Sequence, residues 1–391
     1  MYSDSFDFSK LIYPADERRF FAEFWEKKPL IIQRKDSSYY RDILTESDIE
    51  HILGNVGLPE AVVQLNKSGE YIETKAANGV ADREQLVHQF KRGATIIFRG
   101  LHRFWPRLSR LCRNMEFRLS HKFQTNVYLT PPGKQAFQPH YDTHDVFVLQ
   151  CGGSKRWKIY TSPIALPVQY NKSLVSRDEL DSPEHEFELH EGDLVYIPRG
   201  YVHEAVSDNH ASLHITLGML SMTWADAVRC ALEYAEAEDV EFRRSIPIDF
   251  FNNDASLFES SFKDILDRMH EGTRSQDVLD QIRSKIVCAR TSPLGRSPNL
   301  FSSPNVLSDN SIVRRAPGLF VKIETDENEL RLLFNAKIIH LPRHIEECLS
   351  VIDQREQFKV EDLNGMLDKK GRQILIQSLV DEGFLELMDE P

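Results

Sequence analysis

Three side chains in the middle of the chain have the types and spacing needed to hold a metal ion. His140 and Asp142 lie in the segment PHYD, residues 139–142, and His203 ends the segment PRGYVH, residues 198–203. Alternate residues of a β-strand point to the same face, so we expect His140 and Asp142 to aim at one point. Two imidazoles and one carboxylate form the ligand set of non-haem iron(II) oxygenases, which leaves coordination positions open for other molecules.

The downstream segment is the more specific of the two signals. Gly192, Pro198, Gly200 and His203 have the spacing of the second metal motif of cupin barrels, which this segment resembles. In this interpretation Gly192 begins a turn, residues 193–197 form a strand, and Pro198 and Gly200 form the tight turn that presents the histidine. An H-x-D pair alone occurs by accident in many chains, with an exposed His and Asp as the alternative. The two segments together favour a metal site.

The number of ligands separates this pattern from other metal-binding cupins. Many of these offer H-x-H with a glutamate downstream, whereas here the second position is Asp142 and we expect Phe147 at the position of the glutamate. Three protein ligands leave room for a bidentate co-substrate and dioxygen. The pattern therefore favours an oxygenase over an isomerase or a decarboxylase.

An oxygenase that uses 2-oxoglutarate also needs a cation for the distal carboxylate of this co-substrate. Lys155 and Arg156 lie in the next predicted strand. A carboxylate in a largely apolar barrel requires a charge-assisted partner. By residue type alone, a solvated cation at a strand end is the alternative for either one. His144, His210 and His214 are also close in sequence, and we expect them to support the ligands or the fold rather than to bind the metal.

The elements that must position these residues are short strands. Between about Gln124 and Met222, β-branched and aromatic runs alternate with Gly and Pro turn signals, and the runs are TNVYLT, DVFVLQ, RWKIY, DLVYIP and LHITLGML. Regularly spaced short strands predict an antiparallel sandwich or a small barrel. Helices are predicted ahead of this region at residues 15–25, 45–52 and 83–91, with short strands at 30–32 and 94–98.

The second half of the chain has a different pattern. After Trp224, apolar residues at helical spacing continue to about residue 290, and a Ser-, Pro- and Asn-rich stretch at 291–310 is predicted to be a loop or linker. The remaining residues read as strand, strand, helix, helix, which resembles a winged-helix module. DNA binding is one interpretation of that module. The acidic segment DEGFLELMDEP favours the other, an interaction or dimerisation module.

Composition narrows the classes of protein and partner. With 391 residues, two or three compact units are expected. The formal net charge of −12 argues against general nucleic-acid binding and suits a basic protein or peptide partner. Five scattered cysteines without a C-x-x-C pair indicate free thiols in a reducing compartment. Neither a signal peptide nor a membrane-spanning run is predicted, so we expect the cytoplasm.

The motifs together resemble a known family. The segment TNVYLTPPGKQAFQPHYDTHDVFVLQCGGSKRWKIY is similar to the Jumonji-C ribosomal oxygenases, also called the cupin-4 or ribosomal-protein hydroxylase group. GDLVYIPRGYVHEA resembles their second metal motif, and FFAEFWEKKPLIIQR their N-terminal segment. The resemblance implies an α+β fold with a double-stranded β-helix, the Jumonji-C jelly roll of cupins, within residues 1–224. It also implies a helical dimerisation region at 225–290 and a winged-helix-like domain at 291–391.

The resemblance also assigns roles to individual residues. It implies iron(II) ligation by His140, Asp142 and His203. It implies that a lysine pairs with the distal carboxylate of 2-oxoglutarate, while residues on neighbouring strands assist it or line the pocket. The residues expected to contact the co-substrate or its pocket are Lys155, Tyr128, Asn126, His214 and Thr216.

The implied activity is hydroxylation of an Arg or His side chain of a ribosomal protein by a homodimer that uses iron(II) and 2-oxoglutarate. One departure concerns the residues after Asp142, where many members have an acidic pair or Gln-Tyr and this chain has Thr143-His144-Asp145. This loop is expected to set substrate choice, so the target residue stays open. The alternatives are hydroxylation of a biosynthetic peptide, demethylation of methyl-lysine, and a non-catalytic cupin or winged-helix regulator.

Overall fold

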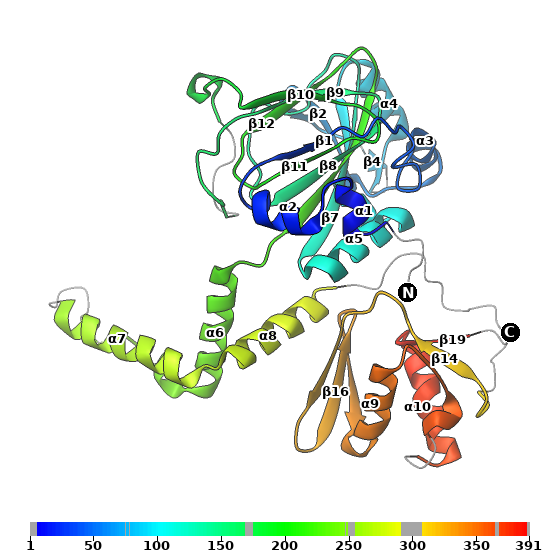
Figure 1. Ribbon diagram of the computed structural model, residues 1–391, viewed down its shortest axis with the longest axis vertical. Helices are drawn as coiled ribbons and strands as arrows, with labels where there is room; N and C mark the ends of the chain where they lie inside the picture. The colour runs from blue at the N-terminus through cyan, green and yellow to red at the C-terminus, as the bar shows by residue number, and fades with distance from the viewer. Residues whose placement is uncertain are drawn as a thin grey trace. The chain divides into compact units, whose positions relative to one another are not determined.

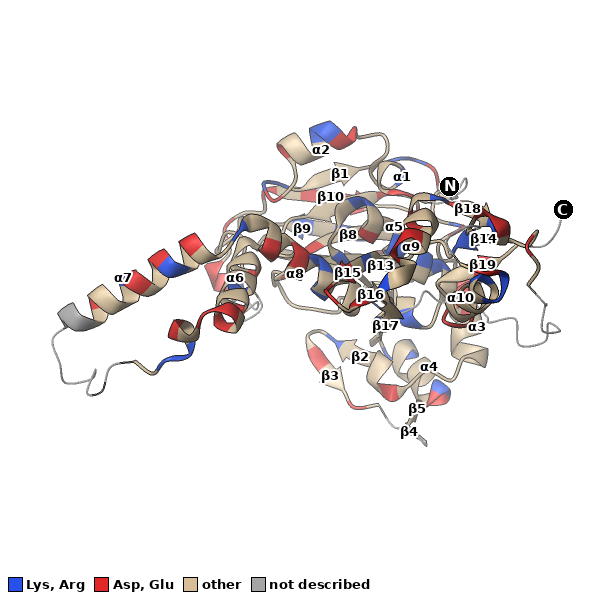
Figure 2. Cartoon of the chain, turned by 90° about the horizontal axis from the view of Figure 1, so that it is seen from below, with Lys and Arg blue, Asp and Glu red and all other residues tan. Residues whose placement is uncertain are grey.

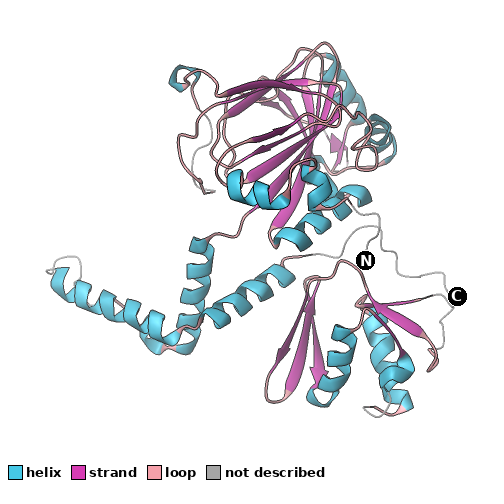
Figure 3. Ribbon diagram, in the orientation of Figure 1, coloured by secondary structure: helices cyan, strands magenta, loops and turns pink. Residues whose placement is uncertain are grey.

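The chain forms two compact units, one over Met1–Ser221 and one that begins at Met222. Figure 1 shows the computed structural model, which describes residues 6–74, 76–77, 79–168, 175–246, 248, 255–290, 307–363 and 367–388. The first unit contains most of the strands, and the second contains three helices followed by a small mixed domain (Figure 3). None of the helices in the described part of the chain has the length and apolar character needed to cross a membrane.

The helices described in the first unit begin at well-defined capping residues. These helices are α1 (Phe8–Ile12), α2 (Glu17–Glu23), α3 (Glu46–Asn55), α4 (Arg83–Lys91) and α5 (Pro106–Leu119). At the start of each of the first four, a side chain accepts a backbone N–H of the first turn, and these caps are Asp7, Asp16, Thr45 and Asp82. The helices predicted at 15–25, 45–52 and 83–91 are confirmed as α2, α3 and α4.

Two antiparallel sheets follow the order of the predicted strands. The larger sheet has the order β1-β11-β8-β13-β7-β6-β2-β3, and the smaller has the order β10-β9-β12. The strands of the larger sheet are β1 (Leu30–Ile32), β2 (Val63–Lys67), β3 (Glu70–Ile72), β6 (Thr95–Arg99), β7 (Lys122–Thr130), β8 (Asp145–Gly152), β11 (Leu194–Ile197) and β13 (Ser212–Leu220). Those of the smaller are β9 (Lys155–Ile159), β10 (His185–Leu189) and β12 (His203–Ser207). A separate pair consists of β4 (Ala76–Ala77) and β5 (Val80–Ala81).

The central strand β8 shows why the larger sheet is apolar on both faces. Val146 and Val148 pack with Trp157 of the smaller sheet. Phe147 and Leu149 point to the opposite face, into the core that includes buried residues of α1, α2 and α5. In Figure 1 these helices lie on the side of the larger sheet away from β9, β10 and β12. A strand buried on both faces reads as a continuous apolar run, as DVFVLQ does.

The second unit contains three longer helices and a small α/β part with its own core. The helices are α6 (Trp224–Glu238), α7 (Ala255–Gly272) and α8 (Ser275–Cys288). The elements that follow are β14 (Ile312–Arg315), β15 (Val321–Thr325), β16 (Glu329–Phe334), β17 (Lys337–Pro342), α9 (Glu346–Gln354), β18 (Gln357–Lys359), α10 (Lys369–Asp381) and β19 (Leu385–Leu387). The predicted two strands and two helices are confirmed as β15, β16, α9 and α10. Most of the predicted linker, residues 291–306, lies outside the described residues.

We predict that Phe147→Ala destabilises the first unit by about 3–5 kcal/mol, the usual range for a fully buried Phe. Phe147 has no exposed surface, and its ring centroid lies 6.1 Å from that of Phe8, 5.9 Å from that of Phe20 and 4.9 Å from that of Tyr196. The measurement is the free energy of unfolding in urea. Phe117→Ala is the matched control, because Phe117 is 46% exposed. Equal losses in the two variants would contradict the assigned core.

Candidate metal centre

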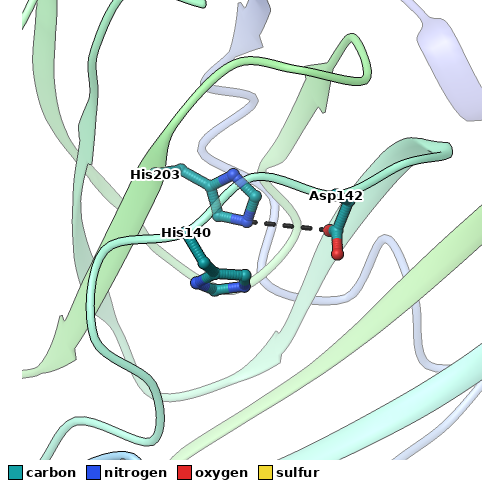
Figure 4. Close-up of side chains that lie close together, drawn as sticks. All are labelled: His140, Asp142 and His203. Carbon is teal, nitrogen blue, oxygen red and sulfur yellow. Dashed lines mark ion pairs between the residues drawn. The ribbon is translucent and has the colours of Figure 1, made fainter. Parts of the chain in front are cut away.

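His140, Asp142 and His203 converge within the first unit, as Figure 4 shows. One ligand atom from each residue lies within 4.8 Å of the other two. Nε2 of His203 is 3.7 Å from Oδ2 of Asp142, and the two imidazole centroids are 4.6 Å apart. A divalent ion binds nitrogen and oxygen at about 2 Å, so these donors need only small side-chain rotations to share one ion. The donor set therefore fits a metal.

The backbone holds the two histidines opposite each other. His203 N donates to His140 O over 2.8 Å, and His140 N donates back to His203 O over 3.3 Å. This is an isolated bridge, and Asp142 lies in the loop before β8. The expectation that strand alternation aims His140 and Asp142 at one point is therefore wrong. Instead, the carbonyl of Asp142 accepts a hydrogen bond from Gly200 N over 3.0 Å, so the turn at Gly200 places it.

Each histidine uses one ring nitrogen to fix its orientation. Nδ1 of His140 lies 2.9 Å from the carbonyl oxygen of Gln138, and Nδ1 of His203 lies 3.0 Å from that of Tyr201. Because a carbonyl only accepts, each Nδ1 carries the proton and each Nε2 keeps a free lone pair. A backbone partner of this kind sets the tautomer that a metal ligand needs.

The charges at the site also suit a cation. Burial, reinforced by His140, lowers the pKa of His203 to about 4, so this imidazole is neutral at neutral pH. Burial raises the pKa of Asp142, but the surrounding imidazoles, of which His144 is the strongest, lower it further, and the net shift is downward. One anionic carboxylate and neutral imidazole form the protonation state that binds a metal ion.

Gly200 is required by the close approach of another loop. Its φ is +96°, a backbone conformation that favours glycine. A Cβ added there would lie 2.5 Å from the carbonyl oxygen of Ile164 and 2.6 Å from Oγ of Ser162. The glycine of the second motif is therefore fixed by sterics, in agreement with the tight turn predicted between Pro198 and His203.

The metal ligands open into a cavity between the two sheets. Besides the three ligands, its wall consists of Tyr128, Ala136, Phe137, Val146, Val148, Lys155, Trp157, Glu204, Ala205, His214 and Thr216. The position expected to correspond to the cupin glutamate needs a correction, because Phe147 faces the opposite core and Val146 faces the cavity. An apolar side chain stands at this point of the wall, one residue earlier than expected. The described donors near the metal therefore remain three.

Lys155 lies on the same cavity wall and is only 2% exposed. Its Nζ donates to Oγ1 of Thr130 over 3.1 Å and is 3.4 Å from Nδ1 of His214. Within the described residues no carboxylate forms an ion pair with it, and burial lowers its pKa to about 7. Burial, followed by the charge of Lys155, also lowers the pKa of His214 well below its usual value. A buried cation without an anion is a site that an external carboxylate can complete.

The other predicted pocket residues occupy different places. Thr216 lines the cavity, and Tyr128 stacks on His214 with centroids 4.8 Å apart and planes 5° apart. Asn126 is not part of the wall. Its Oδ1 accepts from Gly100 N over 3.1 Å, and its side chain hydrogen-bonds Tyr128. Arg156, the alternative cation, is exposed.

Sequence reasoning missed several residues of this wall. Trp157 follows Lys155 by two positions on β9, so strand alternation could have placed it in the cavity. Thr130, the hydroxyl partner of Lys155, comes from β7, and the aromatic Phe137 comes from the loop before His140. No pattern in the sequence indicates these two, because their positions depend on how distant segments meet.

Known proteins are similar to this chain over the region of the site. The JmjC domain model matches residues 100–227. Ribosomal oxygenase 1 of Danio rerio is 34% identical over 62% of this chain and 46% of its own length. Ribosomal oxygenase 2 of Rattus norvegicus is 34% identical over 63% and 55%, respectively. The protein of Aedes aegypti named bifunctional lysine-specific demethylase and histidyl-hydroxylase NO66 is 26% identical over 90% and 62%.

The matched range includes the three converging side chains and Lys155. The chain belongs to the Jumonji-C ribosomal oxygenase family. It spans about half the length of the first curated relatives that it matches. The family resemblance seen in the sequence is therefore confirmed.

A solved structure extends the likeness to the fold of nearly the whole chain. YcfD of Escherichia coli aligns with a TM-score of 0.57 at 14% identity, over 96% of this chain and 98% of that one. A second YcfD structure, described as a complex with cobalt and 2-oxoglutarate, aligns with a TM-score of 0.55 over 96% and 99%. The expected Jumonji-C cupin fold, with a large antiparallel sheet and accompanying helices, is confirmed.

We predict that Lys155→Met stabilises the ligand-free protein, most strongly at low pH. The folded pKa of Lys155, about 7, lies below its ordinary value of 10.5. Below about pH 7 the folded chain carries the full cost of burying the ammonium group, and this cost fades as the pH rises toward 10.5. Thermal unfolding at pH 6 and pH 9 measures the difference, which should shrink at pH 9.

Lys158→Met is the matched control, because Lys158 is on the same strand but its side chain is 40% exposed. This variant should leave the melting temperature nearly unchanged at both pH values. A Lys155→Met protein that melts below the wild type at pH 6 would show that the ammonium is not buried at a cost.

Proposed function

We propose that this chain is an iron(II)- and 2-oxoglutarate-dependent protein hydroxylase. The observation that carries the proposal is a single cavity with a three-ligand metal centre and the buried, carboxylate-free ammonium of Lys155 on its wall. 2-Oxoglutarate has complementary ends, a keto acid that chelates a metal and a distal carboxylate that needs a cation. The YcfD structure with cobalt and 2-oxoglutarate supports the pairing of these two ligands in this fold.

Iron(II) would be held by His140, Asp142 and His203. When bound, it would supply the oxidative chemistry that couples conversion of 2-oxoglutarate into succinate and carbon dioxide to hydroxylation of a side chain. The chain itself fixes the orientation of both imidazoles through their Nδ1 hydrogen bonds. The apolar wall, which includes Val146, Val148 and Trp157, limits the access of water to the reacting groups.

The co-substrate would be fixed by the residues around Lys155. The ammonium pairs with the distal carboxylate, and the hydroxyl of Thr130, which already accepts from Nζ, orients the ammonium. Tyr128 and Thr216 line the same wall, and Asn126 contributes by holding the hydroxyl of Tyr128. These roles follow from the family resemblance and agree with the positions of the side chains.

The proposed substrate is an Arg or His side chain of a ribosomal protein or another basic protein. The names of the relatives include ribosomal oxygenases and a histidyl-hydroxylase. The net charge of −12 favours encounter with a basic partner. A cytoplasmic location is part of the proposal, as is the absence of a nucleic-acid or membrane partner. Demethylation of methyl-lysine is the second candidate, because the name of the Aedes relative includes it.

We predict that the chain adds the mass of one oxygen atom to a ribosomal protein from the same cell, in the presence of iron(II), 2-oxoglutarate and air. Mass spectrometry of the ribosomal proteins identifies the product, and loss of methyl carbons would indicate demethylation instead. His140→Ala and Asp142→Ala should abolish both the product and succinate release, whereas Lys158→Met should retain them. Iron-dependent succinate release by the two ligand variants would refute the metal assignment.

The helical region offers a surface for dimerisation. Apolar side chains recur at intervals of four on two helices, Trp224, Val228 and Leu232 on α6 and Phe258, Phe262 and Leu266 on α7. All six are exposed, and Trp224 is 89% exposed. Figure 2 shows charged residues of both signs along α7 with uncharged residues between them. We propose that a second copy of the chain covers these stripes, which would give the expected homodimer.

The corresponding prediction is that Phe262→Glu, combined with Val228→Glu, converts a dimer into a monomer. Each substitution places a charge in an interface that would otherwise bury apolar surface. Light scattering coupled to size-exclusion chromatography gives the mass. Lys263→Glu is the control, since it changes the charge next to the stripe and should leave the dimer intact. A wild-type protein that is monomeric at micromolar concentration would rule out this interface.

The C-terminal part supports a winged-helix-like module without favouring DNA. Helices α9 and α10 share one core with the sheet β18-β14-β19 and with β16, an arrangement compatible with the expected module. Acidic side chains outnumber basic ones in residues 307–391. We propose that this module helps to receive a basic substrate, because phosphate groups would be repelled by the excess negative charge.

A further inference from the structure

A buried ion network surrounds the turn of the second metal motif. Asp145 has no exposed surface, and Arg199 is only 7% exposed. Nη1 of Arg199 donates to Oδ2 of Asp145 over 2.7 Å, and its Nη2 lies 2.7 Å from Oε1 of Glu26. Such a pair is retained at the cost of desolvating both ions, so its geometry is expected to serve a purpose beyond stability.

The remaining acceptor positions of Asp145 are also occupied. Its Oδ1 accepts from the hydroxyl of Tyr196 over 2.9 Å, and its Oδ2 accepts from Oγ of Ser221 over 3.1 Å. The backbone N–H of Arg199 lies 3.4 Å from Oδ1 of Asp145 as well. The carboxylate is thus fixed, and through it the turn is anchored to the first residue of β8, three positions after Asp142.

Glu26 anchors the turn from the other side. Its φ is 55°, an unusual conformation for a residue with a side chain, and its backbone N–H donates to the hydroxyl of Tyr196 over 3.1 Å. The hydroxyl of Tyr201 donates to the carbonyl of Lys27 over 2.7 Å. The segment after α2 and the start of β8 therefore hold the turn between them, with the guanidinium of Arg199 joining the two.

The same turn orients two of the three metal ligands. Gly200 N donates to the carbonyl of Asp142, and the carbonyl of Tyr201 accepts from Nδ1 of His203. We propose that Arg199 is a positioning residue, whose guanidinium holds the turn that orients Asp142 and His203. The inference rests on the proposed function for its metal but concerns residues that do not touch the metal. Partners that orient metal ligands typically contribute about 10- to 100-fold to metal affinity.

The test is a titration of the metal-free chain with cobalt(II), followed by visible absorption, together with thermal unfolding of each variant. Arg199→Met alone leaves Asp145 buried without a counter-ion and risks misfolding. The informative variant is therefore Arg199→Met with Asp145→Asn, which removes both charges. We expect it to fold and to bind cobalt(II) about 10- to 100-fold more weakly than the wild type. Arg199→Lys, which keeps the charge but can reach fewer partners, should lie between the two.

Asp48→Asn is the matched control. Asp48 is 9% exposed and pairs with Arg107 in the same unit, but it caps α3 and does not touch the turn. This variant should lose thermal stability and keep the cobalt affinity of the wild type. A double variant with unchanged cobalt affinity would overturn the positioning role alone. Failure of the wild type to bind cobalt, or unchanged binding by His140→Ala, would overturn the proposed function and this inference together.

Discussion

The burial of Lys155 without a carboxylate is the constraint around which the rest of the barrel is organised. An ammonium group loses its hydration when it enters an apolar cavity, and the hydroxyl of Thr130 and the ring of His214 replace only part of it. The free energy for this comes from apolar burial elsewhere in the unit. Strand β8 is buried on both faces, and the helices of the N-terminal region extend that core. The site is thus a locally destabilised place on a stable scaffold.

The two sets of groups in the cavity differ in how far they are completed by the chain itself. Near the metal position, Asp142 is surrounded by imidazoles that keep its carboxylate anionic. The backbone acceptors of His140 and His203 already select the tautomer. Lys155, in contrast, has no described anionic partner. Binding of a dicarboxylate with one keto acid would relieve the cost of Lys155 and use the preset donors of the metal centre.

The sequence predicted local structure well where one short segment determines it. The capping pattern at Thr45 predicts α3, and the apolar runs predict β7, β8, β11 and β13. Strands β14, β17 and β18 escaped prediction because IVRR, KIIHLP and QFK contain charged or polar residues and stabilise only through their partners.

The candidate site shows the same boundary between local and long-range information. Residue types and motif spacing indicated His140, Asp142 and His203, and the structure brings their donor atoms together. The mechanism of placement was not accessible, because Asp142 is oriented by a hydrogen bond from Gly200, far along the chain. The register of β8 was also wrong by one residue, since only the packing of both faces shows that Val146 and not Phe147 enters the cavity.

That register has a chemical consequence. In the three-histidine cupins a glutamate on the wall adds a fourth protein ligand, whereas here the corresponding wall is formed by Val146 and Val148. A carboxylate at either place would compete with a chelating co-substrate for the metal and would add negative charge beside Asp142. Two branched apolar side chains exclude both effects, and they also join the sheets through Trp157. The residues that close the barrel core are therefore the same ones that keep half of the coordination sphere available, which links the packing of the fold directly to its chemistry.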